Sequence, residues 1–441
     1  MRKILEEIVQ AGGRPLFVGG CVRDKLMGVE SKDVDVEVYG LSADQLVPVL
    51  SRFGKVDQVG VSFGVIKLRT KDDDFDFTLP RTENKEGRGH KGFVVEVDHT
   101  LTPEVAASRR DYTINSMAMD LDGNLLDPFG GAVDLKLGLL RATSEAFRED
   151  PLRVLRGFQF AGRFNMRADM STLRMCKNLL KEADTIAVER IHDEVVKWAL
   201  KSVKPSAGLG FLADCGWIDL FPELEALMFC PQDPEWHPEG DVFDHTMLVC
   251  DAAAEIAVRD KLCDEDRLVL MLAALCHDLG KPETTVLEGR WRAPGHAKAG
   301  VDPTRSLLTR MGFGESVIKK VVPLVAEHMS HIGTKVTERV VRRMAVRVEP
   351  SNMLQLVRLM EADYSGRHPL PKGRPESVNE ILVMVGALNV ASGKPEPIVK
   401  GRHLIELGMT PGPDFKVVLD RLYQAQLDGL FSDVETGLAM M

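Results

Sequence analysis

The first 140 residues alternate short apolar runs with polar turns. The runs RPLFVGG, DVDVEVY, GVIKLRT and DFDFTL have the period of two that is typical of β-strands, and stretches of helical period lie between them. In DVDVEVY this alternation directs Val34, Val36 and Val38 to one face and Asp33 and Asp35 to the other. The segment is therefore predicted to form a mixed α/β domain whose valines face the core.

The apolar period changes to that of an α-helix from about residue 145. DPLRVLRGFQFAGRF and IHDEVVKWALKS show helical spacing, and no further strand is predicted. With the α/β head at 1–140, we expect an all-helical neck at 141–232 and a histidine-rich helical body at 233–366. The Pro/Gly/basic linker GRHPLPKGRPE then leads into a small helical tail within 367–441. No apolar run is long enough to cross a membrane, and MRKILEEIVQ lacks the apolar core of a signal peptide.

Composition narrows the class of protein further. A chain of 441 residues with 44% hydrophobic and 28% charged residues is long enough for more than one core. The net charge of −10 excludes a general polycation, so nucleic-acid binding would need local clusters of Lys and Arg. Seven cysteines without a CxxC pair indicate free thiols in a reducing cytosol rather than disulfides or a zinc–cysteine site. We therefore expect a cytoplasmic protein, and no obligate protein partner is indicated.

Paired carboxylates in the first domain need a positive charge between them. Asp33 and Asp35 project together from one strand, and carboxylates on one face resist burial. Mg²⁺ prefers such oxygen ligands and shares them with phosphates, and Asp76 in FDFTLP supplies a third carboxylate. The alternative is an exposed, charged edge strand. The Gly-Gly turn favours the metal, because Gly20 at a helix start can hold a triphosphate and Arg23 adds a cation for the same anion.

A second acidic and basic pair lies in EDPLR. Asp150 and Arg153 are three residues apart, which on a helix makes them neighbours on one face. Asp only accepts hydrogen bonds and Arg only donates them. CTP and ATP both present an amino donor beside a ring-nitrogen acceptor, whereas UTP and GTP present the reverse order. The pair is therefore suited to accept C and A, and the alternative is a plain surface salt bridge.

The body carries a second set of polar side chains on otherwise apolar helical stretches. FDHTMLV contains His245, LAALCHDLGKP contains His277 and Asp278, and EADYSGR contains Asp363. Imidazole and carboxylate together suit a divalent transition metal, which makes a nucleophilic water near neutral pH. Second-choice site residues, for which a structural role is an equal alternative, are His296, His328 and His331.

Four motifs in the first half of the chain resemble, in order, those of the class II tRNA nucleotidyltransferase and bacterial poly(A) polymerase family. They are GGCVRDKLMG…KDVDV, LPRTENKEGRGHKGF, RRDYTINSMAMD and EDPLRVLRGFQFAGRF. The resemblance implies a polymerase-β-like head in which an RNA 3′-hydroxyl attacks the α-phosphorus of a nucleotide and pyrophosphate leaves. It also implies that Asp33 and Asp35 hold the catalytic Mg²⁺. The nucleotide-contacting residues that it implies are Gly20, Arg23, Arg110, Arg153 and Arg156.

The product of the head is open among related activities. VGVSFGVIKLRT resembles the tRNA enzymes, whereas bacterial poly(A) polymerases carry a basic, aromatic segment with consecutive arginines after the carboxylate strand. We therefore expect template-independent addition of CCA to tRNA, with CTP and ATP as substrates. Specialised CC-adding or A-adding enzymes and poly(A) polymerase stay as alternatives.

The body resembles the HD phosphohydrolase superfamily. This resemblance implies metal ligands at His245, His277, Asp278 and Asp363, an ion such as Ni²⁺ or Mn²⁺, and phosphatase or 2′,3′-cyclic phosphodiesterase activity that repairs tRNA 3′ ends. A degenerate HD fold that only binds tRNA is the alternative. The tail segment GRHLIELGMTPGPDFKVVLDRLYQAQLDG more resembles other class II enzymes, where it engages the tRNA. A purely hydrolytic enzyme with an inactive head and a non-catalytic tRNA-binding protein are the competing classes.

Overall fold

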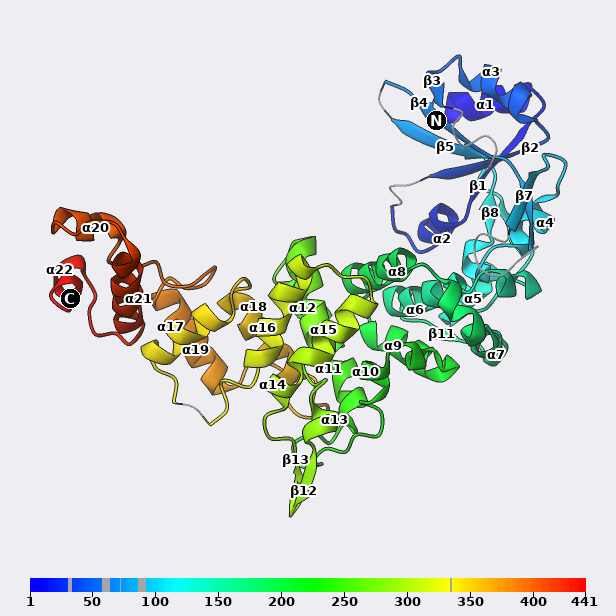
Figure 1. Cartoon of the computed structure of the whole chain (residues 1–441). Coiled ribbons are helices and arrows are strands. Elements are labelled where there is room, and N and C mark those ends of the chain that lie inside the picture. Colours follow the sequence, from blue (N-terminus) through cyan, green and yellow to red (C-terminus); the bar gives the residue numbers. More distant parts are fainter. Residues whose placement is uncertain (31–33, 58–63, 72, 86–92, 334) are drawn as a thin grey trace. The chain divides into compact units, whose positions relative to one another are not determined.

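The chain divides into two compact units. The computed structural model describes residues 1–30, 34–57, 64–71, 73–85, 93–333 and 335–441 (Figure 1). The first unit comprises Met1–Trp198 with Ala207–Leu220, and the second comprises Ala199–Ser206 with Phe221–Met441. The first unit therefore contains the predicted head together with most of the predicted neck. Within the described residues, no helix combines the length and the apolar character that crossing a membrane requires.

A seven-stranded sheet organises the head. Its strand order is β3-β4-β5-β2-β1-β8-β9, in which β2 runs parallel to β5 and every other neighbouring pair is antiparallel. Strands β6 and β7 form a separate hairpin. The elements are α1 (Arg2–Gln10), β1 (Arg14–Val18), α2 (Gly20–Leu26), β2 (Asp35–Tyr39), α3 (Ala43–Leu50), β3 (Lys55–Asp57), β4 (Val65–Arg69), β5 (Asp74–Thr78), β6 (Arg81–Lys85), β7 (Phe93–Val97), α4 (Pro103–Ser108), β8 (Ala118–Met119), β9 (Leu125–Leu126) and α5 (Gly131–Leu137).

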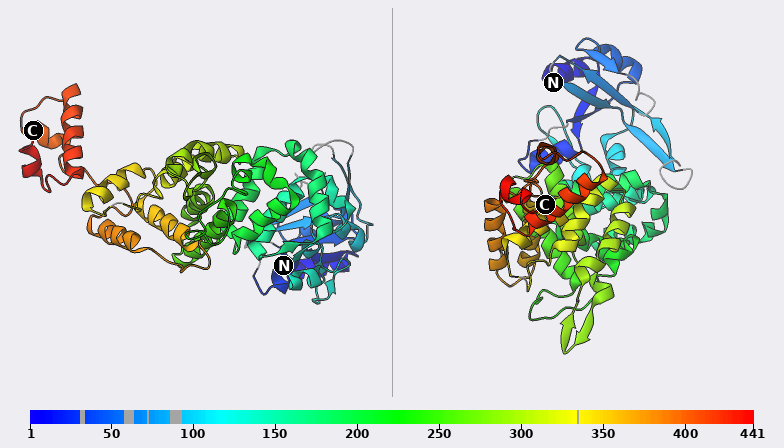
Figure 2. Two further views of the ribbon diagram at one scale, coloured as in Figure 1. Left: turned by 90° about the horizontal axis from the view of Figure 1, so that it is seen from below. Right: turned by 60° about the vertical axis from the view of Figure 1, so that its left-hand side comes forward.

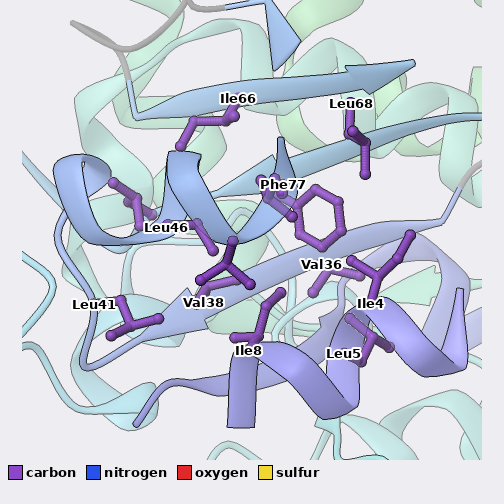
Figure 3. Packing of buried hydrophobic residues seen from close by; sticks show 13 residues of the cluster. Ile4, Leu5, Ile8, Val36, Val38, Leu41, Leu46, Ile66, Leu68 and Phe77 are labelled. Carbon is purple, nitrogen blue, oxygen red and sulfur yellow. The ribbon is translucent and has the colours of Figure 1, made fainter. Parts of the chain in front are cut away.

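The main hydrophobic core of the head lies on one face of this sheet. Helix α1 packs there because Leu5 and two isoleucines recur at helical spacing, and α3 covers the same face (Figure 3). Val36 and Val38 of β2 are buried in this core, as predicted, and the partly buried Val34 packs against it. Because side chains alternate along a strand, Asp35 projects to the opposite face.

The neck is helical with one exception. Strand β10 pairs in parallel with β11, so the expectation of an all-helical neck without strands beyond about residue 145 is wrong for one two-residue strand. The cause is local: Asn165 adopts a left-handed conformation at the end of α6, which turns the chain back alongside β10. The elements are β10 (Leu139–Leu140), α6 (Leu152–Phe164), β11 (Arg167–Ala168), α7 (Met170–Leu179), α8 (Val188–Lys201), α9 (Pro205–Cys215) and α10 (Pro222–Glu225).

Helices α11, α12, α16 and α18 pack together at the centre of the body. Helix α12 is buried continuously from Val269 to Cys276, as expected of a helix that is apolar on all sides. The hairpin β12–β13 was not predicted and extends away from the helices (Figures 1 and 2). The elements are α11 (Val242–Arg259), α12 (Asp264–Cys276), α13 (Lys281–Thr284), β12 (Val286–Glu288), β13 (Arg290–Arg292), α14 (His296–Ala299), α15 (Val301–Arg310), α16 (Glu315–Glu327), α17 (Glu338–Arg347) and α18 (Met353–Ser365).

The predicted linker is an irregular segment between α18 and α19. Helix α19 packs on α17 and α18, so the helical body continues beyond the linker. The last three helices share a small core of Val399, Leu404, Leu422 and Phe431. The helix predicted after the GMTPGP turn is present as α21. The elements are α19 (Glu376–Ala387), α20 (Gly401–Glu406), α21 (Pro413–Leu427) and α22 (Val434–Leu438).

Candidate active sites

Two of the predicted catalytic carboxylates meet on the polar face of the head sheet. In the parallel register of β2 and β5, Asp35 lies directly across from Asp76, and Val36 lies across from Phe77. Because Val36 and Phe77 face the core, Asp35 and Asp76 project together from the other face. Asp33 lies outside the residues that the structure describes.

Two further charged residues on this face, Lys67 and Glu37, were not predicted from the sequence as site residues. Lys67 of β4 pairs with Asp76, with 3.5 Å between Nζ and Oδ2. Glu37 follows Asp35 at the next position of the same face and is buried, where its Oε2 accepts a hydrogen bond of 2.6 Å from the hydroxyl of Tyr39. The Oε2 of Glu37 also lies 3.7 Å from Nη2 of Arg110. The alternation of DVDVEVY was the signal that could have identified Glu37.

The Gly-Gly turn brings Arg110 against the start of α2. Gly19 adopts a φ of 71°, in the left-handed region that favours glycine, and is the N-cap residue of the helix that begins at Gly20. A Cβ on Gly19 would lie 2.7 Å from Nη1 of Arg110, so a larger residue would displace this guanidinium. The structure therefore places the predicted Arg110 beside Gly19, the residue that precedes the predicted Gly20.

Arg23 is engaged within the protein. Its side chain is buried, with Nε and Nη2 donating to Oδ1 of Asp24 at 2.9 and 2.6 Å. Its Nη1 donates to Oδ1 of Asn115 at 2.5 Å, and its guanidinium lies 4.5 Å from the ring centre of Phe164. Arg23 thus joins α2 to α6, and its predicted contact with a triphosphate stays a prediction.

Arg156 is tied to the head by a buried carboxylate. Its Nε donates to Oδ2 of Asp111 at 2.6 Å, and Oδ1 of Asp111 accepts from Nδ2 of Asn115 at 3.1 Å and from the backbone N–H of Tyr112 at 2.7 Å. Burial opposes ionisation of Asp111, but the charge of Arg156 and these hydrogen bonds hold the pKa of the carboxyl below its usual value. Asn115 connects this group to Arg23, which gives the RDYTIN segment a structural role.

The structure corrects the prediction that Asp150 and Arg153 lie on one face of a helix. Asp150 is extended, with φ −126° and ψ 110°, and precedes α6, because the following Pro151 disfavours helical geometry at the residue before it. Its Oδ2 pairs with Nη2 of Arg190 at 3.0 Å. Arg153 donates instead to two backbone carbonyls, those of Ala146 at 2.7 Å and Arg109 at 2.8 Å. The alternative of a surface salt bridge between the pair is therefore wrong, and their selection of bases stays a prediction.

The four predicted HD ligands converge from three helices. Nε2 of His245, on α11, lies 3.1 Å from Oδ1 of Asp363, on α18, and 3.8 Å from Oδ2 of Asp278. Nε2 of His277, at the end of α12, lies 3.1 Å from Oδ2 of Asp278 and 4.0 Å from Oδ1 of Asp363. Donor atoms at these separations fit around one divalent ion held at about 2.1 Å from each.

Buried polar atoms in this cluster indicate that it is built for a cation. Nε2 of His277 is buried without a hydrogen-bond partner among the described residues. The Nδ1 of His277 contacts the carbonyl of Ala274 at 2.8 Å, and the Nδ1 of His245 contacts Oε1 of Glu239 at 2.7 Å. These outer contacts orient each ring with Nε2 toward the carboxylates. Hydrogen bonds from His237 and His245 outweigh burial and lower the pKa of Glu239 to about 2.

Two of the three second-choice histidines adjoin the cluster. Nε2 of His296 lies 3.3 Å from Oδ1 of Asp278 and 3.2 Å from Nε2 of His328. Burial lowers the pKa of His328 to about 3, so that its ring is neutral. His331 lines the cavity beside the cluster, where its Nδ1 contacts the carbonyl of His328 at 3.1 Å.

A cavity of about 500 Å³ opens onto this cluster. Asp278, His296 and Asp363 contribute to its wall. Lys281 lies within 2.7 Å of both Oδ2 of Asp278 and Oε1 of Gln232. Cations suit the phosphate of a nucleotide, and aromatic rings suit its base. The remaining cationic and aromatic wall residues are Arg290, Arg292, Arg367, Trp236, Trp291 and Tyr364.

Comparison with known families and structures defines the class of protein. Residues 16–141 match the Poly A polymerase head domain, and residues 242–385 match the HD domain. The fold is similar to that of Bacillus stearothermophilus CCA-adding enzyme in complex with CTP, with a TM-score of 0.65 and 21% identity over 98% of this chain and 93% of that one. It is also similar to that of Thermotoga maritima CCA-adding enzyme complexed with tRNA, with a TM-score of 0.62 and 20% sequence identity. The match covers 100% of this chain and 93% of that enzyme. The class is that of nucleotidyltransferases whose head is joined to an HD domain, which confirms the predicted fold.

Curated relatives identify the family. The multifunctional CCA protein of Pasteurella multocida (strain Pm70) is 38% identical over 366 residues, which cover 80% of this chain and 83% of the relative. The multifunctional CCA protein of Nitrosococcus oceani is 34% identical over 389 residues, which cover 86% of this chain and 91% of that relative. The chain belongs to the family of multifunctional CCA proteins. The family resemblance of the four motifs and of the HD segment is thereby confirmed.

Proposed function

We propose that the head adds C, C and A to tRNA 3′ ends from CTP and ATP. We also propose that the HD cluster hydrolyses phosphate esters, including 2′,3′-cyclic phosphates at RNA ends. The observation that carries the first proposal is the alignment of Asp35 with Asp76 next to the turn that Gly19 forms with Arg110. The family of multifunctional CCA proteins, and the similar CCA-adding enzymes whose structures contain CTP, ATP or tRNA, support the choice of substrates.

The carboxylates of the head provide ligands that suit Mg²⁺. Asp33, Asp35 and Asp76 would hold the ions, because the side chain of Asp76 is 44% exposed and carboxylate oxygens are the ligands that Mg²⁺ prefers. Bound Mg²⁺ would lower the pKa of the attacking 3′-hydroxyl and would neutralise the negative charge on the leaving pyrophosphate. The turn at Gly19 would bring backbone N–H groups close to a bound triphosphate, and Arg110, which lies against Gly19, would provide a cation beside them.

Base selection is assigned to the start of the neck. Asp150 is a hydrogen-bond acceptor whose side chain is held by Arg190. Arg153 is a hydrogen-bond donor whose side chain is held by two backbone carbonyls. Anchored groups hold their hydrogen-bonding directions, which a protein template for C and A requires. Gly20, Arg23 and Arg156 complete the proposed nucleotide site.

The HD cluster suits a divalent transition metal such as Ni²⁺ or Mn²⁺ at His245, His277, Asp278 and Asp363. Bound there, the metal supplies a nucleophilic water near neutral pH. Lys281 and the arginines around the cavity supply charge for the phosphate that is attacked. Convergence of the full ligand set supports hydrolysis over a degenerate, purely RNA-binding HD fold.

The tail is proposed to add contacts to tRNA, supported by Lys400 and Arg402 at the start of α20. The proposal places both reactions in the cytoplasm, where the free thiols of all seven cysteines stay reduced.

Incubation of the protein with tRNAs that end in the discriminator base, C or CC tests the head. We expect CMP and AMP incorporation that stops after the A. Elongation beyond it would indicate a poly(A) polymerase, and partial addition a CC- or A-adding specialist. Asp35→Ala should abolish addition, whereas Asp74→Ala, which alters an exposed residue of the neighbouring strand β5, should retain it. Arg153→Ala should admit UMP or GMP. Retained addition by Asp35→Ala would contradict the proposed site.

A further inference from the structure

The hairpin β12–β13 forms part of the wall of the cavity beside the HD cluster. Its second strand contributes Arg290, Trp291 and Arg292, and all three residues line the cavity. The volume of about 500 Å³ is within the roughly 300–1,000 Å³ of pockets that hold small ligands. Because Asp278 and Asp363 line the same cavity, a molecule whose phosphate meets the HD cluster can extend toward the hairpin.

Contacts at the base of the hairpin fix its position against the loop that precedes α11. Nη1 of Arg290 lies 3.6 Å from Oδ2 of Asp233. The thiol of Cys230 lies 3.6 Å from the hydroxyl of Thr285, which immediately precedes β12. The strand that carries Trp291 is therefore anchored before any ligand arrives. An anchored ring loses little conformational freedom when a flat ligand binds to it.

Trp291 is the aromatic residue of the wall that is both anchored and open to a ligand. The guanidinium of Arg367 lies 4.0 Å from the ring centre of Tyr364, so one face of that ring is covered. Trp236 lies in a turn and is 50% exposed. Trp291 lies on a strand and is partly buried. Such a ring suits stacking on a nucleobase, which tolerates any sequence because every base has a π-face.

Arg292 is the cation of the wall that is left for a ligand. The other Lys and Arg residues of the wall have partners inside the protein: Arg290 pairs with a carboxylate, Arg367 lies over an aromatic ring, and Lys281 contacts a carboxylate of the HD cluster. The exposed side chain of Arg292 makes no hydrogen bond or ion pair with any residue that the structure describes. A guanidinium without a carboxylate partner suits a phosphate.

We propose that Trp291 stacks on the base of the 3′-terminal nucleotide of an RNA, and that Arg292 contacts the phosphate that links this nucleotide to the preceding one. The inference rests on the proposed hydrolytic function of the HD cluster, which would attack the terminal phosphate. A base can stack on the indole only when it is unpaired, so the site takes single-stranded ends. Because stacking tolerates any base, the site accepts ends of different sequence and favours an RNA chain over a free nucleotide.

Hydrolysis of two substrates that share a cyclic phosphate tests the role of Trp291. 2′,3′-Cyclic AMP carries a base, whereas glycerol 1,2-cyclic phosphate does not. Trp291→Ala should raise the KM for 2′,3′-cyclic AMP about 5- to 150-fold with little change in kcat, and should leave hydrolysis of the glycerol ester unchanged. Trp291→Phe, which keeps a ring, should recover most of the loss. An equal loss with both substrates would overturn the stacking.

Leu287→Ala is the matched control for this residue. Leu287 pairs with Trp291 across the hairpin and is 63% exposed, but it does not belong to the cavity wall. The variant should hydrolyse both substrates as the parent protein does. A KM for 2′,3′-cyclic AMP raised as far as in Trp291→Ala would assign the effect to the hairpin as a whole and overturn the stacking.

The dinucleotide ApA with a terminal 2′,3′-cyclic phosphate tests the role of Arg292. The parent protein should hydrolyse it with a kcat/KM roughly threefold to tenfold above that for 2′,3′-cyclic AMP. Arg292→Gln should remove this preference and leave the reaction of the mononucleotide unchanged. Lys319→Gln, which removes an exposed cation of α16 outside the cavity wall, should keep the preference. A preference that persists in Arg292→Gln, or is missing in the parent protein, would overturn the contact.

Tryptophan fluorescence separates this inference from the proposed function, because it needs no hydrolysis. In a Trp236→Phe background the tryptophans other than Trp291 are Trp198 and Trp217, which are both fully buried. 2′-AMP should quench the fluorescence of this protein, and ribose 5-phosphate should not. Quenching by 2′-AMP in a protein that hydrolyses no phosphate ester would support the stacking and remove the proposed activity. Hydrolysis of 2′,3′-cyclic AMP with a KM that Trp291→Ala leaves unchanged would keep the activity and overturn the stacking.

Discussion

At the scale of single residues, the sequence predicted charge-bearing side chains better than their partners. Asp35 and Asp76 could be chosen because an acidic residue in an apolar strand is unusual. The partners of Arg156 could not, because Asp111 is 45 residues away in the chain. Asp150 was misplaced although Pro151 carried the signal, since proline disfavours helical geometry at the preceding residue.

Asp111→Asn should destabilise the first unit at neutral pH. The substitution removes the buried charge that faces Arg156, and we expect the free energy of unfolding to fall by about 2 kcal/mol. This value is small for a buried ion pair, because the Arg156 side chain is 38% exposed and water screens the interaction. The folded-state pKa of Asp111 is lowered, so its contribution is fully present above the unfolded pKa of about 3.8 and is lost as the pH falls through the folded value. Urea unfolding between pH 7 and pH 3 measures this difference.

Asp122→Asn is the control, because Asp122 is an exposed carboxylate in the same unit. It should leave the unfolding free energy within about 0.5 kcal/mol of the parent protein. An Asp111→Asn protein as stable as the parent at pH 7 would show that Arg156 and Asp111 contribute no net stability.

At the scale of elements, periodicity found the strands and helices that build the sites. It missed β10, β11 and the hairpin β12–β13, whose strands of two or three residues are too short to show a period. It also missed how closely helices approach. Gly157 of α6 lies against Tyr112 and Phe211, and a Cβ there would be 2.1 Å from the hydroxyl of Tyr112 and 2.7 Å from Cζ of Phe211. This contact holds α6, and with it Arg153, against the head, because the same hydroxyl donates to the carbonyl of Arg153 at 2.9 Å.

Gly157→Ala should therefore separate α6 from the head. We expect a loss of about 1–3 kcal/mol in unfolding free energy from overpacking, together with reduced nucleotide addition and unchanged phosphate-ester hydrolysis. Gly210→Ala is the matched control, since Gly210 lies in α9 with no atom within 4 Å of its added Cβ. That change should be neutral or stabilising by up to about 1 kcal/mol. Equal stability of the two variants, measured by denaturant unfolding, would contradict the role of this contact.

At the scale of the whole molecule, the two sites belong to different compact units. Asp35 and Asp76 lie in the first unit, and the HD cluster lies in the second. The sequence predicted both sites, because each has local motifs. It did not predict His296 and His328 as partners, because their relation to Asp278 depends on how α12, α14 and α16 pack. Since no described residue belongs to both sites, each activity should survive loss of the other.

Mixing two inactivated proteins tests this independence. A tRNA that ends in a 2′,3′-cyclic phosphate lacks the free 3′-hydroxyl that addition requires. The HD site must therefore act first, opening the cyclic diester at its P–O3′ bond and then hydrolysing the remaining 2′-phosphate to release inorganic phosphate. Asp278→Ala should extend tRNA with a free 3′-hydroxyl but not this blocked tRNA, and Asp35→Ala should unblock the tRNA without extending it. Glu283→Ala, an exposed change on α13, should do both. A mixture of the two inactivated proteins should restore labelled CMP incorporation, because repaired tRNA can leave one chain and bind another. A mixture that stays inactive while the parent protein extends blocked tRNA would mean that RNA passes between the sites within a single chain.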